Sequence, residues 1–392
     1  MASRRSFLKT VGASAAAFGT GSCVRRLPAS SSVIAPGPIS RVIRLGANEN
    51  PYGPGPAARA AIQRAVGEAN RYPFPIVGQL TEAIGSHVRV ETSCLALGCG
   101  STELLDAAVS AFTSKDRCLV TAAPTFEATA RRASTIGSRV IAVPVDEHGE
   151  LNLEGMAERA GAAGLVYVCN PNNPTGTVCD WSALETFVTQ VHERSSAATI
   201  LIDEAYHDYV ESPSYRTAIS LAVADPRVIV TRTFSKVYGM AGLRIGYLVG
   251  RAETLRDVRP WLGSLGMANL GAAAAVASLE DPVHVEQQRT LNHEARQVTR
   301  DAFERAGHRS FASEANFLMI DVGRDARAFA ASCMTRGIQV ARAFPPLTNH
   351  ARISIGTRAE MNRAIPVFLD ILAQPPSMTT LFDFASYDRH EC

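Results

Sequence analysis

Three short polar segments of this chain carry side chains that could do chemistry, and each directly follows an apolar run. They are Asn170–Gly176, Asp203–Tyr206 and Thr233–Lys236. Amides, carboxylates and amines can take part in acid–base or covalent chemistry. Taken singly, each segment also has an ordinary explanation: the first could be a turn, Asp203 could cap a helix, and Lys236 could be a solvated lysine. Their positions in the fold therefore decide the interpretation.

Apolar runs alternate with Ala-rich stretches between about residues 90 and 250, and this predicts how the three segments are positioned. The pattern is typical of successive βα units and a largely parallel sheet. Ligands of such sheets gather at the carboxyl ends of the strands, so the three segments could face one site. The predicted strands are Arg117–Ala122, Val140–Val145, Leu165–Cys169, Thr199–Ile202, Val228–Thr231 and Ile245–Val249.

The sequence changes in character after residue 285, which predicts a second, smaller domain. A charged helical stretch, Glu286–Gly307, leads to the apolar segment Ser313–Asp321 and a further helix. A chain of 392 residues also exceeds the usual size of a single core. The expected organisation is a signal and linker over 1–35, a large domain over 75–285, a small α+β domain from 36–74 and 286–375, and a C-terminal tail over 376–392.

Composition and charge exclude several classes of protein. Hydrophobic residues make up 46% and charged residues 19%, an ordinary globular balance that is too polar for a multi-span membrane protein. The net charge is +2 and no Lys/Arg run occurs beyond the N-terminus, so nucleic acid is not an expected partner. The eight cysteines show neither metal-ligand pairs nor a dense disulfide framework, so we expect mostly free thiols and no metal site.

The N-terminus resembles a twin-arginine export signal. Ser3–Lys9, which contains two adjacent arginines, precedes the Ala/Gly-rich stretch Val11–Phe18, and no acidic residue occurs before Glu49. We therefore expect a periplasmic or other extracytoplasmic location and no membrane span in the mature protein. The cleavage point stays open, and lipid attachment at Cys23 is an alternative.

Nine segments, taken together and in order, resemble the fold-type I pyridoxal-5′-phosphate (PLP) aminotransferases of class I and II, and among them the histidinol-phosphate aminotransferase-like branch. The resemblance covers about residues 40–370 and implies an α/β fold with a mostly parallel seven-stranded sheet. The segments are Ala47–Tyr52, Arg71–Pro73, Gly98–Glu103, Pro124–Phe126, Asn172–Gly176, Asp203–Tyr206, Ser235–Lys236, Gly242–Gly246 and Arg352–Gly356.

The resemblance implies roles for five residues around the cofactor ring. Lys236 would bind PLP as a Schiff base and then move the substrate proton. Asp203 would pair with the pyridinium nitrogen, which PLP needs as an electron sink. Asn173 and Tyr206 match the partners of the ring hydroxyl. Phe126 matches the aromatic side chain that stacks on the ring, although it could also be a core phenylalanine.

The resemblance also implies a phosphate site at the turn into a helix that begins near Thr102, where backbone N–H groups suit an anion. Cys99 and Thr102 stand where many relatives have Asn and Asp, which puts the detail of this site in doubt. Tyr72 matches a tyrosine that reaches the phosphate from a partner subunit, so the resemblance implies a homodimer. The other residues implied are Gly100, Ser101, Ser235 and Arg244.

On the substrate side, Arg352 matches the arginine that grips a terminal anion with a bidentate fork. Arg342 lies where such enzymes place a second substrate-side arginine, although a solvated surface arginine is the alternative. Asn48 is also expected at the substrate. The resemblance implies transfer of an amino group between an amino acid, or an amine like histidinol phosphate, and a 2-oxo acid, for which 2-oxoglutarate is expected.

Two other functions stay open from the sequence. One is a PLP-dependent lyase, racemase or decarboxylase on the same fold, since motifs do not fix the reaction type. The other is an exported binding protein without catalysis, which would not need Lys236. The complete motif set and Arg352 favour the aminotransferase. Histidine biosynthesis is cytoplasmic, however, so an export signal argues for a physiological substrate other than histidinol phosphate.

Overall fold

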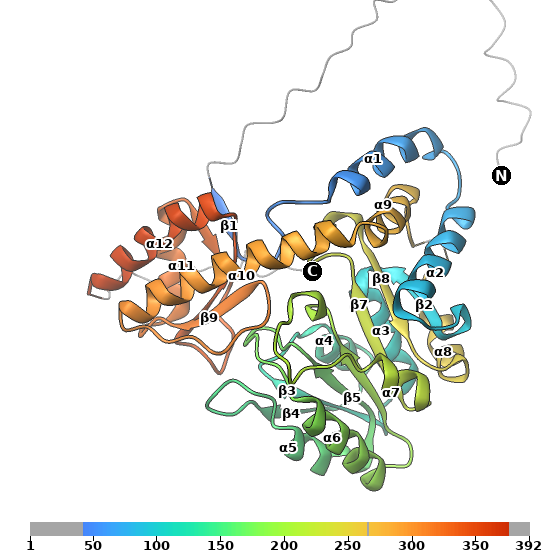
Figure 1. Cartoon of the computed structure of the whole chain (residues 1–392). Helices are drawn as coiled ribbons and strands as arrows, with labels where there is room; N and C mark the ends of the chain where they lie inside the picture. The colour runs from blue at the N-terminus through green and yellow to red at the C-terminus, as the bar shows by residue number, and fades with distance from the viewer. Residues whose placement is uncertain (1–41, 265, 376–392) are drawn as a thin grey trace, which may run out of the picture. The chain divides into compact units, whose positions relative to one another are not determined.

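The computed structural model describes residues 42–264 and 266–375 (Figure 1). Its largest sheet has seven strands in the order β2-β8-β7-β6-β5-β3-β4. Strand β8 runs antiparallel to β2 and β7, whereas the other neighbours run parallel, which confirms the mostly parallel sheet. The strands are β2 (Leu95–Cys99), β3 (Cys118–Ala123), β4 (Val140–Pro144), β5 (Ala163–Cys169), β6 (Thr199–Asp203), β7 (Val228–Thr233) and β8 (Ile245–Val249).

Each strand predicted from an apolar run is present, and β2 is the strand that the sequence analysis missed. Strands β5 and β6 are buried along their whole length, as expected of parallel strands covered on both faces. Alternate side chains enter different cores. Val166 and Ile200 pack with Leu184 of α6 (Trp181–Arg194), whereas Leu165 and Leu201 pack with Leu104 of α3 (Gly100–Phe112). The sheet is therefore the middle of three layers.

Helices cover this sheet and extend beyond it. Two of them, α1 and α2, pack against α9. The helices of this part are α1 (Pro56–Ala65), α2 (Phe74–Val88), α3 (Gly100–Phe112), α4 (Ala128–Thr135), α5 (Leu153–Glu158), α6 (Trp181–Arg194), α7 (Ile219–Ala224), α8 (Ala252–Val258) and α9 (Asn269–Leu279). Short 3₁₀ helices are η1 (Val66–Glu68), η2 (Thr92–Cys94), η3 (Ala160–Ala162), η4 (His207–Tyr209), η5 (Ala241–Leu243) and η6 (Arg259–Trp261).

The C-terminal elements form a separate hydrophobic cluster that also takes in the first strand. Strand β1 pairs in parallel with β10, and β11 pairs antiparallel with β9. Ile43 and Leu45 of β1 are buried with Phe303, Phe329 and Phe368. Both ends of the described chain thus build one core. Its elements are β1 (Ile43–Leu45), α10 (Pro282–Arg305), β9 (Phe317–Asp321), α11 (Ala326–Thr335), β10 (Ile338–Val340), β11 (His350–Ser354) and α12 (Arg358–Ala373).

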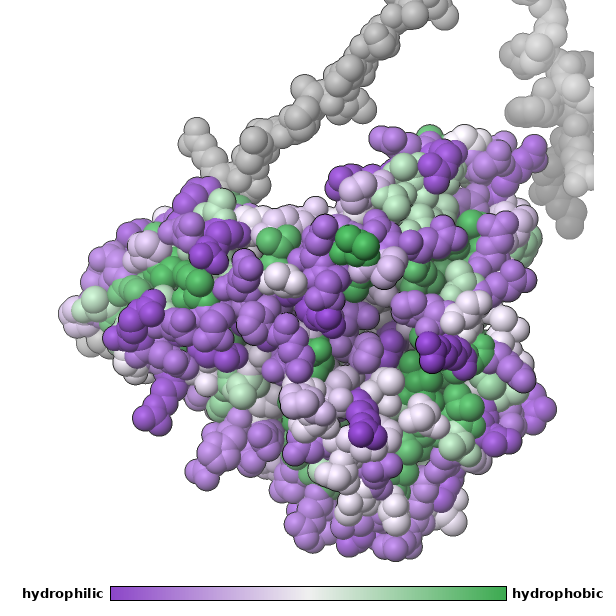
Figure 2. Space-filling view, viewed as in Figure 1, coloured by the Kyte–Doolittle hydropathy of each residue, from purple (hydrophilic) through white to green (hydrophobic). Residues whose placement is uncertain are grey.

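Several predictions concern boundaries or residues that the structure tests only in part. The domain boundaries stay a prediction, and Ala58 of α1 packs in the core of the large sheet. The signal over 1–35, Cys23 and the tail over 376–392 lie outside the described residues. Within these residues, no helix is long and apolar enough to cross a membrane, and the cysteines are free thiols. The face in Figure 2 is mostly hydrophilic, with separate apolar areas.

Candidate active site

Asp203, the last residue of β6, has a buried carboxylate held by both neighbouring strands. Tyr167 of β5 donates a hydrogen bond to Oδ2 at 2.9 Å, and Thr231 of β7 donates one to Oδ1 at 3.1 Å. Burial raises the pKa of Asp203 to about 6, while these two hydrogen bonds and the nearby Lys236 oppose the rise. A carboxylate with such a pKa gains from a cationic partner, so this position suits a protonated ring nitrogen.

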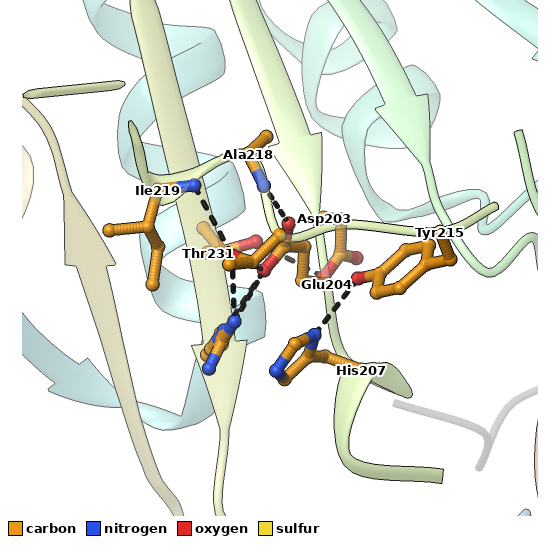
Figure 3. Close-up of polar contacts among 9 residues, drawn as sticks. Asp203, Glu204, His207, Tyr215, Ala218, Ile219 and Thr231 are labelled. Carbon is orange, nitrogen blue, oxygen red and sulfur yellow. Dashed lines mark hydrogen bonds and ion pairs between the residues drawn. The ribbon is translucent and has the colours of Figure 1, made fainter. Parts of the chain in front are cut away.

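Glu204 follows Asp203 and anchors the end of β6 through a second buried network (Figure 3). Its Oε2 accepts from Arg232 Nη2 at 2.8 Å and Nε at 2.9 Å, and from Thr217 Oγ1 at 2.8 Å. The backbone N–H of Ala218 donates to Oε1 at 2.6 Å. A buried ion pair needs such extra hydrogen bonds to offset its desolvation. The sequence analysis did not single out this pair, which fixes the backbone next to Asp203.

Lys236 lies after β7, with its amine close to two other predicted residues. Nζ donates to the Asn48 carbonyl at 3.3 Å and lies 5.4 Å from the centroid of the Tyr206 ring. Burial and, to a smaller extent, the Arg352 guanidinium lower the pKa of Lys236 to about 8, and Asp203 opposes both. About a tenth of this amine is therefore neutral at about pH 7, far more than for a solvated lysine, and the neutral form is the nucleophile.

Asn48 joins the N-terminal segment to this cluster. Its Nδ2 donates to Tyr206 Oη at 3.0 Å, and Ser354 Oγ both accepts from its N–H at 2.8 Å and donates to its Oδ1 at 2.9 Å. Asn316 Nδ2 donates to its carbonyl at 3.0 Å. Asn48 has a φ of +54°, a strained value for a residue with a side chain, which these bonds hold in place. Ser354 and Asn316 are contributors that the sequence analysis missed.

Arg352 of β11 is 5% exposed and faces the Asn173 side chain. Nη1 donates to Asn173 Oδ1 at 2.7 Å, and Nη2 donates to the Gly46 carbonyl at 2.5 Å. Its guanidinium carbon lies 5.6 Å from the Phe317 ring and 4.7 Å from the Phe344 ring. A buried guanidinium with its planar fork of donors suits the carboxylate of a ligand.

The predicted phosphate site lies at the start of α3, which begins at Gly100 rather than near Thr102. Its first backbone N–H groups lack partners within the helix, and this end carries a partial positive charge. Gly100 has a φ of +76°, and a Cβ there would overlap the Arg244 guanidinium. Only glycine therefore lets Arg244 lie against the helix terminus. Ser101 also lies in this first turn.

Arg244 contacts neutral oxygens in the described part of the chain. Nη1 lies 3.5 Å from Ser235 Oγ and 3.1 Å from the Ala241 carbonyl, and Nη2 lies 3.4 Å from the Cys99 carbonyl. None of these partners neutralises the guanidinium. Together with the N-terminus of α3, Arg244 and Ser235 form a cradle that suits a phosphate.

Three predicted residues make none of the hydrogen bonds described above. Phe126 is half-buried and packs against the core on the α3 side of the sheet. Tyr72 is 69% exposed and contacts the Phe74 ring, so its side chain takes no part in the hydrogen bonds around Lys236. Arg342 is not a fully solvated arginine: its Nη2 pairs with Glu127 Oε2 at 2.6 Å.

These groups fit the cofactor PLP. Lys236 offers a partly neutral amine for its aldehyde, Asp203 offers a carboxylate for its ring nitrogen, and the cradle at Gly100 and Arg244 offers donors for its phosphate. Asn173 and Tyr206 belong to the same cluster through their contacts with Arg352 and Asn48. The structure thus brings together most of the predicted site residues, and adds Tyr167 and Thr231.

Comparisons with known proteins agree with this geometry. The aminotransferase class I and II family model matches residues 40–368. A histidinol-phosphate aminotransferase of Moorella thermoacetica is 35% identical over 316 residues, 80% of this chain and 81% of the relative. An aromatic amino acid aminotransferase of Thermobifida fusca is 36% identical over 301 residues, 76% of this chain and 82% of the relative.

Solved structures are similar over most of the chain. A putative histidinol-phosphate aminotransferase from Erwinia carotovora atroseptica has a TM-score of 0.81 at 29% identity, over 84% of this chain and 96% of that one. The histidinol-phosphate aminotransferase of Sinorhizobium meliloti, in complex with PLP, has a TM-score of 0.79 at 29% identity, over 84% and 90%. The chain therefore belongs to the class I and II aminotransferases and is a PLP-dependent transaminase.

Proposed function

We propose that this enzyme moves an amino group from an amino acid, or from an amine like histidinol phosphate, to a 2-oxo acid, and that 2-oxoglutarate is the acceptor. The observation that carries the proposal is a pair of arginines on one aromatic ring. The guanidinium carbons of Arg352 and Arg342 lie 4.7 Å and 4.5 Å from the centroid of Phe344. Two neighbouring cations suit a substrate with two anionic groups, and 2-oxoglutarate is a dicarboxylate.

The relatives named above agree with this range of donors, because they include both a histidinol-phosphate and an aromatic amino acid aminotransferase. A phosphate or a carboxylate could pair with Arg342, whereas an aromatic donor would use Arg352 alone. One site would then accept both a large neutral donor and a small dicarboxylate acceptor. Arg342 must therefore tolerate substrates with and without an anionic side chain.

Lys236 performs the proton transfer in this proposal. Bound PLP supplies an electron sink that makes the Cα–H bond of the substrate acidic. With PLP and substrate bound, the Nζ of Lys236 would accept the Cα proton of the substrate and later return it. The pKa of about 8 suits this task, since such an amine both accepts and releases a proton near neutral pH.

The other residues bind and orient. Asp203, fixed by Tyr167 and Thr231, holds the proton on the ring nitrogen. The first turn of α3 and Arg244 hold the phosphate. Arg352 would bind the substrate carboxylate. Its bond with Asn173 uses the amide oxygen, so the Asn173 Nδ2 could donate to the ring hydroxyl oxygen.

A donor and acceptor screen tests the proposal. The purified holoenzyme is assayed with glutamate, aromatic amino acids and histidinol phosphate against 2-oxoglutarate, and then with pyruvate and oxaloacetate as alternative acceptors. We expect 2-oxoglutarate to give the highest kcat/KM as acceptor. A higher value with pyruvate would contradict the role of a second anion, because pyruvate carries one carboxylate.

We also propose a homodimer in which Tyr72 reaches the partner's phosphate site. Val66, Tyr72 and Phe74 are 56%, 69% and 66% exposed, and a surface depression between α1, α2 and α9 is lined by apolar residues such as Ile76 and Val276. Exposed aromatic and aliphatic side chains in one region are typical of an interface. Light scattering should give a dimer mass, and fully active monomers at assay concentration would contradict it.

The proposed location is extracytoplasmic, by the twin-arginine route. The support is the order of basic, apolar and small residues before residue 35, which lie outside the described residues. This route carries folded proteins, so PLP would be loaded before export. Replacing Arg4 and Arg5 by lysine should retain the protein in the cytoplasm, and unchanged fractionation would refute the proposal.

A further inference from the structure

We infer that Glu127 is a specificity-determining residue: its carboxylate occupies Arg342 and must be displaced before an anionic substrate side chain can bind there. The inference rests on the proposed role of Arg342 as the second anion site. It adds a competitor inside the protein, which the family match does not assign. Glu127 would thus set how strongly the enzyme prefers anionic over neutral side chains.

The position of Glu127 comes from a rigid loop at the carboxyl end of β3. Thr125 Oγ1 donates to Asn172 Oδ1 at 2.8 Å, and Asn172 Nδ2 donates to the Pro124 carbonyl at 3.2 Å. These bonds tie the loop to the segment that carries Asn173. Glu127 follows Phe126 directly and precedes α4. Its carboxylate therefore starts from a fixed backbone beside the candidate cofactor site.

Arg342 lies in the segment that follows β10, far from Glu127 in the sequence. Nη2 lies 2.6 Å from Glu127 Oε2, Nη1 donates to the Ala343 carbonyl at 2.8 Å, and the guanidinium stacks on Phe344. Phe344 also supports Arg352, so the ring places the Arg342–Glu127 pair next to the buried cation. A substrate bound to Arg352 would therefore extend its side chain toward an ion pair rather than toward a lone charge.

The exposure of the two side chains makes this ion pair exchangeable. The Arg342 and Glu127 side chains are 33% and 47% exposed, whereas Arg352 is 5% exposed. Partly exposed pairs are weak and are screened by salt, so a substrate anion can replace the Glu127 carboxylate. With a neutral side chain the pair stays closed and presents no net charge. When the substrate side chain is anionic, it displaces the Glu127 carboxylate from Arg342 and is repelled by that carboxylate.

The test compares Glu127→Gln, which removes the charge but keeps the shape, with wild type. Glutarate and pentanoate are the probes, because they have the same number of carbons and differ by one carboxylate. Their dissociation constants for the holoenzyme are measured by calorimetry, which needs no turnover. We expect the variant to bind glutarate about two- to fivefold more tightly, the range of a partly exposed ion pair, and pentanoate equally well. Higher salt should shrink the difference.

Two further variants make the outcome decisive. Glu253→Gln is the matched control, because Glu253 pairs with Arg251 at 2.6 Å with similar exposure and lies in α8. It should change neither dissociation constant. In Arg342→Gln, the Glu127→Gln substitution should have a smaller effect on glutarate binding, because no cation remains for it to release.

The outcomes separate this inference from the proposed function. If Arg342→Gln weakens glutarate binding but Glu127→Gln leaves it unchanged, Arg342 binds the anion and the inference about Glu127 alone is overturned. If neither substitution alters the preference for glutarate, the second anion site itself is wrong. If Glu127→Gln weakens both ligands and lowers the melting temperature, the pair has a structural role and the inference fails.

Discussion

Tyr167 donates its phenolic hydrogen to Asp203 at 2.9 Å, from the neighbouring strand and in a fully buried setting. The register of the sheet sets this contact, because Cys169 of β5 lies opposite Asp203 of β6 and Tyr167 lies two residues earlier on the same face. The bond acts against burial, which alone would favour a neutral Asp203. Tyr167 is therefore a positioning residue whose effect reaches the cofactor through Asp203.

The substitution Tyr167→Phe should raise the pKa of Asp203 above about 6, because the hydrogen bond stabilises the ionised form. The acidic limb of the kcat/KM profile should move to higher pH, and PLP should bind less tightly. At neutral pH we expect kcat/KM to fall about tenfold, which corresponds to ~1.4 kcal/mol. A pH-rate profile and a PLP titration measure both effects.

The matched control for that prediction is Tyr215→Phe. Tyr215 Oη bonds His207 Nδ1 at 3.1 Å and does not contact Asp203 (Figure 3). Tyr215→Phe removes the hydroxyl of a part-buried tyrosine, so it reports the cost of losing a tyrosine hydroxyl in this region. An identical pH profile for Tyr167→Phe and wild type would refute the role of Tyr167.

Borohydride reduction of the holoenzyme should leave PLP attached to Lys236. The basis is the lowered pKa of the amine and its place beside Asn48 and Tyr206. Lys236→Ala should bind PLP without a covalent link and lose turnover, because the proton carrier is gone. Peptide mass spectrometry locates the adduct. The control is Lys115→Ala, on the turn before β3, which should keep both the adduct and the activity. An adduct on any lysine other than Lys236 would refute the assignment.

Glu204→Gln should destabilise the protein by about 3–5 kcal/mol, because it leaves the buried Arg232 guanidinium without its counter-ion (Figure 3). Denaturant unfolding gives the free energy. The double variant Glu204→Gln, Arg232→Met should recover part of the loss, since no unpaired charge is then buried. The exposed pair of Glu253 and Arg251 serves as control, and Glu253→Gln should leave the free energy of unfolding nearly unchanged. Equal losses in Glu204→Gln and Glu253→Gln would contradict the prediction.

Arg352→Ala should reduce kcat/KM for every substrate by roughly two to four powers of ten, as expected when one partner of a desolvated charge pair is lost. Arg352→Lys should restore little, because the bidentate fork is absent. Arg342→Ala should impair only substrates with an anionic side chain, such as glutamate or histidinol phosphate. Steady-state kinetics with anionic and with neutral substrates measure these effects. Equal losses of kcat/KM on all substrates in both variants would show that the two arginines do not have separate roles.

Local patterns in the sequence were sufficient for most of the large sheet. A parallel strand covered on both faces must be apolar along its length, so runs such as Leu165–Cys169 predict strands directly. Strand β2 escaped this rule because it lies at the edge of the sheet, is only half-buried at Leu97 and Cys99, and owes its place to antiparallel pairing with β8. The motif order around Lys236 and Arg352 was also sufficient to indicate the family, which the family match then confirmed.

Tertiary structure decided which side chains meet. The bond between Asn48 and Tyr206 spans 158 residues, and the bonds between Asn48 and Ser354 span 306. The pairing of Glu127 with Arg342 depends on a loop after β3 and a segment after β10. No local sequence pattern encodes such contacts, because they form only when segments far apart in the sequence pack against one another in the folded chain. The sequence by itself determined the strands, the cofactor lysine and the arginines as candidates, whereas only the folded chain determined that Arg342 shares Phe344 with Arg352 and pairs with Glu127.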